Sequence, residues 1–264
     1  MRQKLLDAAI LVDTTLFRAY MLVSPSLAGS LFRLDNFCSA EVVEEKLYES
    51  GRYNELLDFL GGKKLHQEAL TLLEKFGKDE SHDEALEDFR GPTRTIRYLQ
   101  QLPFELIDLI LQHARWPLQV EPTSGMQIFV ADTENAESLP RDKVVDFLTS
   151  VDPSLVTRYL EHIINELDDK TSSFHDRLAR LYIDAVKSQA EPTSDDKDVS
   201  WQQKLDTFLR SSKHFDKNGI LKTLPTDGER FQSAILLQDK TPTNHARSTL
   251  LRVTRNRAKQ IVVS

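Results

Sequence analysis

The chain has 264 residues, 40% of them hydrophobic and 28% charged, which is enough apolar material for one or two globular domains. Its nine glycines and ten prolines fall below the average usage of about 7% and about 5%, which argues against turn-rich β-sandwiches and barrels and against collagen-like or low-complexity chains. The formal net charge is −7, and residues 241–264 contain no Asp or Glu, so the rest of the chain is still more acidic, which disfavours nucleic acid as a partner.

The sequence contains one cysteine, Cys38. A single thiol cannot form an intramolecular disulfide, so a disulfide-built secreted scaffold is excluded. Zinc sites built on thiolates are excluded as well, because they need cysteines in twos and fours. A reduced compartment, most simply the cytosol, is therefore expected.

The first predicted element is an apolar helix from Leu5 to Val23. Asp7, Asp13 and Arg18 interrupt it, whereas a membrane-spanning helix needs about 20 predominantly apolar residues. Asp7 also lies where a signal peptide would carry its apolar region. We therefore expect a buried amphipathic helix.

Three short helices are expected next, and each ends at glycine: residues 42–48 before Gly51, 53–60 before Gly61 and Gly62, and 65–73 before Gly77. Gly51 is expected to adopt the left-handed C-cap conformation. Short helices joined by very short turns pack antiparallel to their neighbours.

Residues 44–77 also have the length of one helical-hairpin repeat of about 34 residues, with Leu47, Gly51, Tyr53 and Ala69 at the packing positions. The sequence therefore predicts an all-α fold. Its expected architecture is an α-solenoid of stacked antiparallel helix pairs, similar to TPR or clathrin-heavy-chain repeats.

The clearest amphipathic helix runs from Asp152 to Leu167. Asp152 is a favourable N-cap, and Pro153 occupies the first helical position, where its missing N–H is not needed. Leu160 and Ile164 lie in the middle of the apolar stripe, so both are expected to be buried. A second stripe follows over residues 174–185.

Helical patterning resumes at Trp201 and returns in residues 220–224 and 231–236. Pro242 would break a helix that ran on from there. Residues 79–92 and 188–200 are acidic and polar, which is typical of solvated loops. We divide the chain into six segments: N-terminal helical hairpins (1–78), an acidic loop (79–92), central solenoid helices (93–187), a second acidic loop (188–200), C-terminal solenoid helices (201–239) and a basic, disordered tail (240–264).

No motif predicts a reaction centre. Gly62-Lys63-Lys64 resembles the end of a phosphate-binding loop but lacks the first glycine and a preceding strand, so we interpret these as turn residues. Ala28-Gly29-Ser30 lacks the sheet of a nucleophile elbow. His162 and Glu166 are one helical turn apart, as two metal ligands would be, but a solvated pair on the polar face is the simpler interpretation.

The other polar candidates also have structural explanations. His113 and Trp116 share one apolar helix and are expected to pack, and Cys38 is expected to be a small buried hydrophobe. The acidic pairs Asp168-Asp169 and Asp195-Asp196 lie in polar stretches and do not converge. We therefore predict no enzyme and assign no catalytic, cofactor-binding or metal-binding residue and no cofactor.

Two segments carry a specific resemblance: Ser138-Leu139-Pro140-Arg141-Asp142-Lys143-Val144 and Tyr159-Leu160-Glu161-His162-Ile163-Ile164. They resemble the vacuolar sorting protein 39 family, whose members are subunits of the HOPS membrane-tethering complex. Further segments match the same family in the same order: residues 12–16, Leu65 with 67–70, 96–102, 125–129, 174–178 and 205–209. The collinear match runs from about Leu5 to Leu237.

The resemblance implies a non-catalytic scaffold acting in endosome and vacuole or lysosome fusion. It implies other HOPS or CORVET core subunits and a Rab-type small GTPase as partners, and a cytoplasmic location, peripheral on the vacuole or late-endosome membrane. Family members usually begin with a β-propeller and continue their solenoid past Leu237, so a middle segment is expected. Two alternatives stay open: the related CORVET subunit of early endosome fusion, and an unrelated helical-repeat co-chaperone that binds peptides.

Overall fold

The computed structural model describes residues 2–81, 83–188, 199–224 and 229–237. Every regular element within these ranges is an α-helix or a 3-10 helix, and none is a strand. The predicted all-α class is confirmed. Most of the second acidic loop and all of the basic tail from residue 240 lie outside the described residues.

The chain forms two compact units, Met1–Tyr159 and Leu160–Ser264. The helices of the first unit are α1 (Arg2–Val23), η1 (Pro25–Leu27), α2 (Ala28–Phe32), α3 (Ala40–Glu49), α4 (Tyr53–Gly62), α5 (His66–Gly77), η2 (Glu84–Phe89), α6 (Thr93–Gln101), η3 (Phe104–Leu106), α7 (Ile107–Val120), α8 (Pro122–Gly125), α9 (Gln127–Val130), α10 (Glu134–Glu137) and α11 (Arg141–Val151). Helix α12 (Pro153–Asn165) contains the boundary. The second unit continues with α13 (Ser172–Ser188), α14 (Trp201–Ser211), α15 (Lys217–Thr223) and α16 (Glu229–Leu237).

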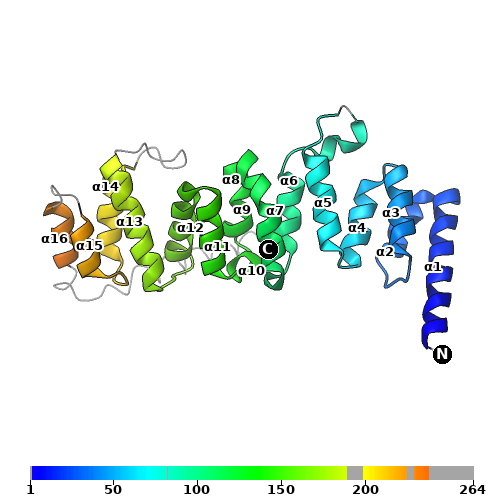
Figure 1. Cartoon of the computed structure of the whole chain (residues 1–264), viewed down its shortest axis with the longest axis horizontal. Helices are drawn as coiled ribbons and strands as arrows, with labels where there is room; N and C mark the ends of the chain where they lie inside the picture. The colour runs from blue at the N-terminus through cyan, green and yellow to red at the C-terminus, as the bar shows by residue number, and fades with distance from the viewer. Residues whose placement is uncertain (1, 82, 189–198, 225–228, 238–264) are drawn as a thin grey trace, which may run out of the picture. The chain divides into compact units, whose positions relative to one another are not determined.

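Consecutive helices of the first unit pack on one another. The contacting pairs include α3 with α4, α4 with α5, α5 with α6, and α6 with α7, and Figure 1 shows these helices side by side. Aromatic rings join several of them, with ring centroids 4.9 Å apart for Phe32 and Phe59 and 4.6 Å apart for Tyr53 and Phe76. Each short helix is therefore covered by its neighbours along the chain.

The first two glycine-ended helices stop in different ways. Gly51 has a φ of +65°, as expected, and the N–H of Arg52 donates to the carbonyl of Leu47 at 2.9 Å, which is the hydrogen bond of a Schellman motif. Helix α4 ends at Gly62, as expected, with Gly61 and Gly62 in its last turn. The left-handed residue after α4 is Lys64, with a φ of +59°.

Gly77, the last residue of α5, is required by packing and not by backbone conformation. A Cβ at this position would lie 2.6 Å from Cη2 of Trp116 and 2.9 Å from the carbonyl oxygen of Gly91. The indole of Trp116 is buried on α7. The missing side chain therefore allows the end of α5 to approach α7 closely.

The first acidic segment, expected as a solvated loop, contains η2. Asp83 caps this short helix by accepting the N–H of Ala85 at 2.9 Å. Leu86 and Phe89 are buried, and the Phe89 ring lies 5.6 Å from that of Phe76 in α5. The segment therefore contributes two side chains to the core beside α5.

Three helices of the second unit meet at Glu161. Its Oε1 accepts the hydroxyl of Tyr182 in α13 at 2.7 Å and the ammonium of Lys204 in α14 at 3.0 Å. Helix α14 begins where the pattern predicted, with Ser200 and Gln203 forming a capping box. Helix α12 is capped as expected, since Asp152 accepts the N–H of Ser154 at 2.8 Å.

The sequence predicts that Leu160 and Ile164 of α12 are both buried, and the structure confirms this for Leu160 but not for Ile164. Leu160 is fully buried and Ile163 is 1% exposed, whereas Ile164 is only half-buried. The two neighbours Ile163 and Ile164 are separated by about 100° around the helix, so the covered face includes the first and leaves the second at its margin. The expectation that Ile164 is buried is wrong.

We predict that Leu160→Ala lowers the free energy of unfolding by about 2–5 kcal/mol, because it leaves a cavity in a closed part of the core. Ile164→Ala is the matched control and should cost clearly less. Urea unfolding followed by circular dichroism measures both values. Equal losses would contradict the orientation of α12.

Replacing the last glycine of α4 or of α5 by alanine should change the free energy of unfolding in opposite directions. Gly62→Ala should stabilise by up to about 1 kcal/mol, as alanine normally does in a helix, because the nearest atom to its Cβ is 3.7 Å away. Gly77→Ala should instead destabilise by about 1–3 kcal/mol, because the methyl group overpacks against Trp116. Melting temperatures that rise for both variants would show that α5 and α7 are further apart than described.

Candidate functional site

One face of α1 is fixed to the rest of the first unit. Phe17 is fully buried, and its ring centroid lies 5.7 Å from that of Phe32 in α2. The hydroxyl oxygen of Thr14 accepts the N–H of Ser39 at 3.0 Å, and the carboxylate of Asp13 accepts the N–H of Phe37 at 2.7 Å. Side-chain packing and two hydrogen bonds therefore hold the 33–39 loop against this face.

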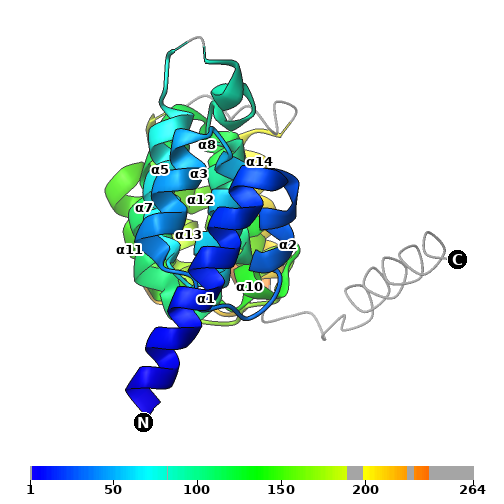
Figure 2. The ribbon, with the colours of Figure 1, turned by 90° about the vertical axis from the view of Figure 1, so that its right-hand side faces the viewer.

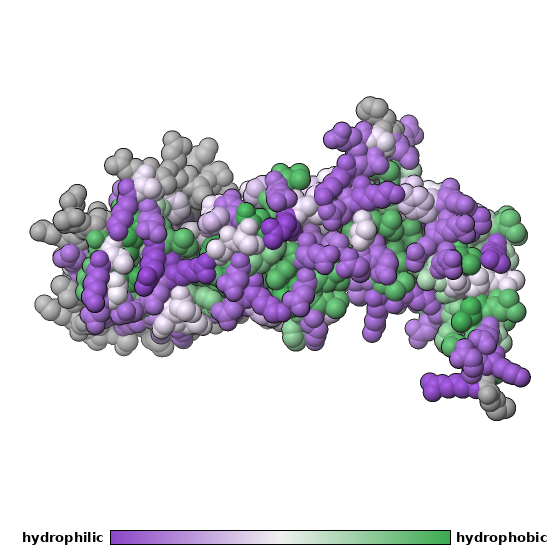
Figure 3. Space-filling view, in the orientation of Figure 1, coloured by the Kyte–Doolittle hydropathy of each residue, from purple (hydrophilic) through white to green (hydrophobic). Residues whose placement is uncertain are grey.

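The opposite face of α1 is apolar and exposed, so the expectation of a buried helix is wrong. Thr14 and Phe17 are its only buried residues, while Val12 is 62% and Val23 is 85% exposed. Figure 3 shows hydrophobic side chains at the surface over α1. The N-terminal turns project past the helices that α1 packs against in both views (Figure 1, Figure 2). The exposed large apolar residues of α1 are Leu5, Leu6, Leu11, Val12, Leu16, Leu22 and Val23.

The 33–39 loop, which is bound to α1 through Asp13 and Thr14, also exposes Leu34 and Phe37, which are 68% and 51% exposed. Single exposed apolar side chains are ordinary, but a contiguous apolar patch marks an interaction site. The candidate functional site is therefore a surface for binding another macromolecule, formed by α1 and the 33–39 loop. The sequence shows that α1 is apolar, but only the fold shows that one side of it is uncovered.

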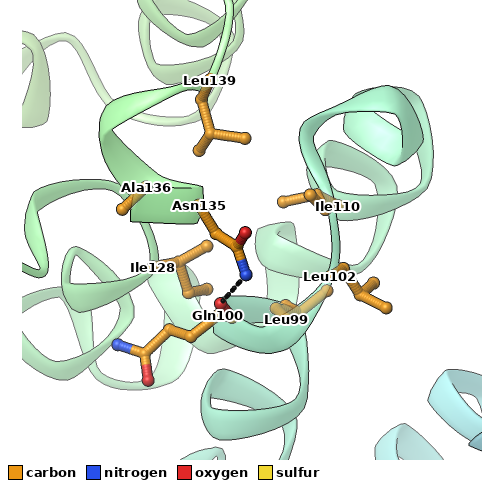
Figure 4. A pocket seen from close by; sticks show the side chains of 8 residues that line it. All are labelled: Leu99, Gln100, Leu102, Ile110, Ile128, Asn135, Ala136 and Leu139. Carbon is orange, nitrogen blue, oxygen red and sulfur yellow. Dashed lines mark hydrogen bonds between the residues drawn. The ribbon is translucent and has the colours of Figure 1, made fainter. Parts of the chain in front are cut away.

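An apolar depression lies between α6, α7, α9 and α10 (Figure 4). It is lined by Leu99, Gln100, Leu102, Ile110, Ile128, Asn135, Ala136 and Leu139. The side-chain amide of Asn135 donates to the carbonyl of Gln100 at 3.1 Å, so a polar group that faces the depression is engaged. The depression has no room for even a water molecule, and it is too small for a cofactor.

A buried polar cluster joins the loops around α13. His175 Nε2 lies 2.7 Å from the carbonyl oxygen of Asp169, and its Nδ1 lies 2.7 Å from the hydroxyl of Ser212. A carbonyl can only accept, so Nε2 carries the proton and Ser212 donates to Nδ1 of the neutral ring. Sequence analysis missed this pair, because the two residues are 37 positions apart and share no motif.

A serine that donates to a histidine resembles the nucleophile and base of covalent catalysis. His175 is 3% and Ser212 is 8% exposed, so a substrate cannot reach the hydroxyl. The cluster instead ties the segment after α14 to the start of α13. Burial lowers the pKa of His175, and the nearby His214 lowers it further, while the hydrogen bond to Asp169 and the charges of Asp169 and Asp176 act in the opposite direction.

His113 and Trp116 of α7 are both buried, which confirms their expected packing role. Nε2 of His113 lies 3.0 Å from the side-chain nitrogen of Gln67 in α5, and its Nδ1 lies 3.3 Å from the carboxylate of Glu74. The ammonium of Lys78 lies 5.6 Å from the centre of the Trp116 ring. These contacts strengthen the packing of α5 on α7.

The remaining sequence candidates are not brought together. Cys38 is buried as expected, and burial raises the pKa of its thiol. Gly29 and Ser30 lie in α2, and the ammonium of Lys63 binds the carbonyl of Asn36. Asp169 is buried and its carboxylate accepts the N–H of Thr171 at 2.7 Å.

The described part of the chain contains no group of three or more His, Cys, Asp or Glu side chains placed to hold a metal ion, and the pair of His162 and Glu166 acquires no third ligand there. Among these same residues, no helix combines the length and the apolar character needed to cross a bilayer. The acidic pair Asp195-Asp196 lies outside the described residues.

Known proteins resemble this chain over most of its length. The family model for vacuolar sorting protein 39 domain 1 matches residues 12–118. The Vam6/Vps39-like protein of Mus musculus is 34% identical over 252 residues, which cover 89% of this chain and 28% of that protein. The chain belongs to the vacuolar sorting protein 39 family.

Two further relatives extend the same match. The vacuolar morphogenesis protein 6 of Schizosaccharomyces pombe is 32% identical over 235 residues, covering 86% of this chain and 26% of that protein. The vacuolar protein sorting-associated protein 39 homolog of Drosophila melanogaster is 33% identical over 231 residues, with the same two coverages. The chain thus spans about a quarter of the length of these curated relatives. No solved structure matches it.

We predict that His175 makes the stability of this family member pH-dependent. Its pKa in the folded chain lies below the value of about 6.5 that it has when unfolded, so the unfolded state binds the proton more readily. The contribution of His175 is therefore complete above about pH 6.5 and is lost as the pH falls from there through the folded pKa.

The urea midpoint between pH 7.5 and 5 measures this effect, and His175→Gln is the variant that cannot titrate. The wild type should lose more stability across this range than the variant does. His66, whose pKa burial also lowers, contributes the same background slope to both proteins. Identical slopes would contradict the neutral, buried state of His175.

Proposed function

We propose that this chain is a non-catalytic scaffold and protein-interaction segment of a HOPS-type membrane-tethering subunit. The subunit would act in the fusion of endosomes with the vacuole or lysosome. The observation that carries the proposal is the 34% identity to the mouse Vam6/Vps39-like protein over 89% of the chain. The names of the yeast and fly relatives, which refer to vacuolar morphogenesis and vacuolar protein sorting, support the same process.

The fold we propose for this role is an α-solenoid of stacked antiparallel helix pairs. The packing of each helix of α3–α7 on the next along the chain supports it, because helix pairs that contact mainly their neighbours build such a stack. The six-segment division made from the sequence, including a basic tail over residues 240–264, is part of this proposal.

The proposed role requires surfaces that bind other proteins and does not require a catalytic site. The Ser212–His175 pair is closed to substrates, the depression beside Asn135 has no room for a ligand, and the apolar face of α1 is open. These observations support a binding function over an enzymatic one. The partners we propose are other core subunits of the tethering complex and a Rab-type small GTPase. The location we propose is cytoplasmic, peripheral on the vacuole or late-endosome membrane.

A chimera tests this function. The segment of the S. pombe relative that matches this chain is replaced by residues 1–264, and vacuole morphology and co-purification of the other tethering subunits are measured. We expect the chimera to maintain normal vacuoles and the intact complex.

The matched controls are a deletion of the segment and a chimera that carries Leu160→Asp, which places a charge in the core. Both should give abnormal vacuoles. A chimera that is folded and expressed, yet leaves the complex incomplete, would contradict the proposal.

A further inference from the structure

Thr93 lies at the surface with a free hydroxyl. It is the first residue of α6, where the 79–92 segment returns to the helices (Figure 1). Its side chain is exposed, and its hydroxyl has no hydrogen-bond partner among the described residues. Thr95, two residues further on, is by contrast fully buried. The hydroxyl of Thr93 is therefore accessible to an enzyme that modifies it.

Arginine side chains surround this hydroxyl along the sequence. Arg90 lies three residues before Thr93, Arg94 directly after it and Arg97 four residues after it. The first turn of α6 contains no acidic residue, and no side chain caps its start. A negative group on Thr93 would therefore meet positive charge and no neighbouring carboxylate in its own turn.

Arg97 is placed to bind such a group. Residues four apart on a helix lie one turn apart on the same face, and Arg97 is exposed like Thr93. Its guanidinium forms no hydrogen bond or ion pair with another described residue. Because arginine binds phosphate through two parallel hydrogen bonds, a phosphate on Thr93 would find an unoccupied partner one turn away.

The other two arginines hold the backbone before α6. Arg94 donates to the carbonyl of Asp88 at 3.2 Å, and Arg90 donates to the carbonyl of Asp83 at 3.4 Å. The carboxylate of Asp88 lies 4.0 Å from the guanidinium of Arg94, and its side chain is 84% exposed. This carboxylate is therefore free to turn into solvent, away from a phosphate on Thr93.

We propose that Thr93 is a phosphorylation site for a protein kinase that selects arginine three residues before its target. Arg90 occupies that position, and kinases discriminate between substrates by such charge patterns. The kinase transfers the γ-phosphoryl group of MgATP to Oγ1 of Thr93, the hydroxyl proton passes to the catalytic base of the kinase, and ADP leaves. The modification goes beyond the proposed function and does not depend on it.

The phosphate would stabilise the start of α6. A phosphate near a helix N-terminus or opposite arginine forms about one to three charge-assisted hydrogen bonds. On Thr93 it meets both conditions, because the first N–H groups of α6 lack an intrahelical partner and Arg97 lies on the same face. Phosphorylation therefore changes the charge of this surface and strengthens the helix that carries it.

The first experiment incubates the whole chain with calmodulin-dependent protein kinase II, Ca²⁺–calmodulin and MgATP, and measures phosphate at each residue by mass spectrometry. Thr171 is the matched site, since it is exposed and directly precedes α13 but has Asp168 three residues before it. We expect Thr93 to be phosphorylated faster than Thr171 by about tenfold or more.

Two arginine variants test the selection. Arg90→Ala should slow phosphorylation of Thr93 by about tenfold or more, whereas Arg97→Ala, on the other side of the target, should leave the rate nearly unchanged. Circular dichroism checks that both variants keep their helices. A chain that acquires no phosphate at Thr93 would overturn the proposal. Equal rates at Thr93 and Thr171, or for the wild type and Arg90→Ala, would overturn it as well.

The second experiment compares the melting temperature before and after treatment with the kinase. We expect a rise of about 1–3 °C that is absent from Thr93→Ala treated in the same way. Arg97→Ala should lose a large part of the rise. Arg180→Ala is the control and should keep it, because Arg180 is likewise exposed and without a partner among the described residues. A fall on phosphorylation, or equal rises for the two arginine variants, would contradict the binding of the phosphate by Arg97.

Discussion

The structure depends on the burial of one helix face by the next helix along the chain. Helices such as α3, α4 and α5 have 10, 10 and 12 residues, and isolated helices shorter than about 12–15 residues are marginal in water. Their stability therefore comes from tertiary contacts, including the Phe17–Phe32–Phe59 ring series and the close approach of Gly77 to Trp116. Among the described residues no helix covers the apolar residues of α1 such as Val12 and Val23, which stay exposed.

This constraint explains which features the sequence could predict. The period of 3.6 residues is a local property of the sequence, so the all-α class could be predicted from it. Helix starts also depend on nearby residues, so the start of α14 after Ser200 and the capping of α12 by Asp152 could be predicted as well. The left-handed Gly51 could also be predicted, because a glycine after a short helix usually serves this purpose.

Features that depend on distant partners could not be predicted. Apolar character indicates that a face favours burial but not whether a partner covers it, so α1 was expected to be buried. The left-handed conformation after α4 falls on Lys64, which no pattern in the sequence marks. Ile164 lies at the margin of a face whose width depends on the neighbours of α12. The Ser212–His175 pair forms only when α13 and the segment after α14 meet.

The candidate site and the proposed function follow from the same packing principle. A tethering subunit needs extended surfaces on a rigid support, and the helix layers of the first unit hold α1 by one face only. Hydrogen exchange of the whole chain tests this account most directly. Amides of α4–α7 should be strongly protected, while those of residues 5–11, where α1 has no buried side chain, should exchange much faster. Protection of residues 5–11 as strong as that of α4–α7 would show that this part of α1 is covered and would contradict the account.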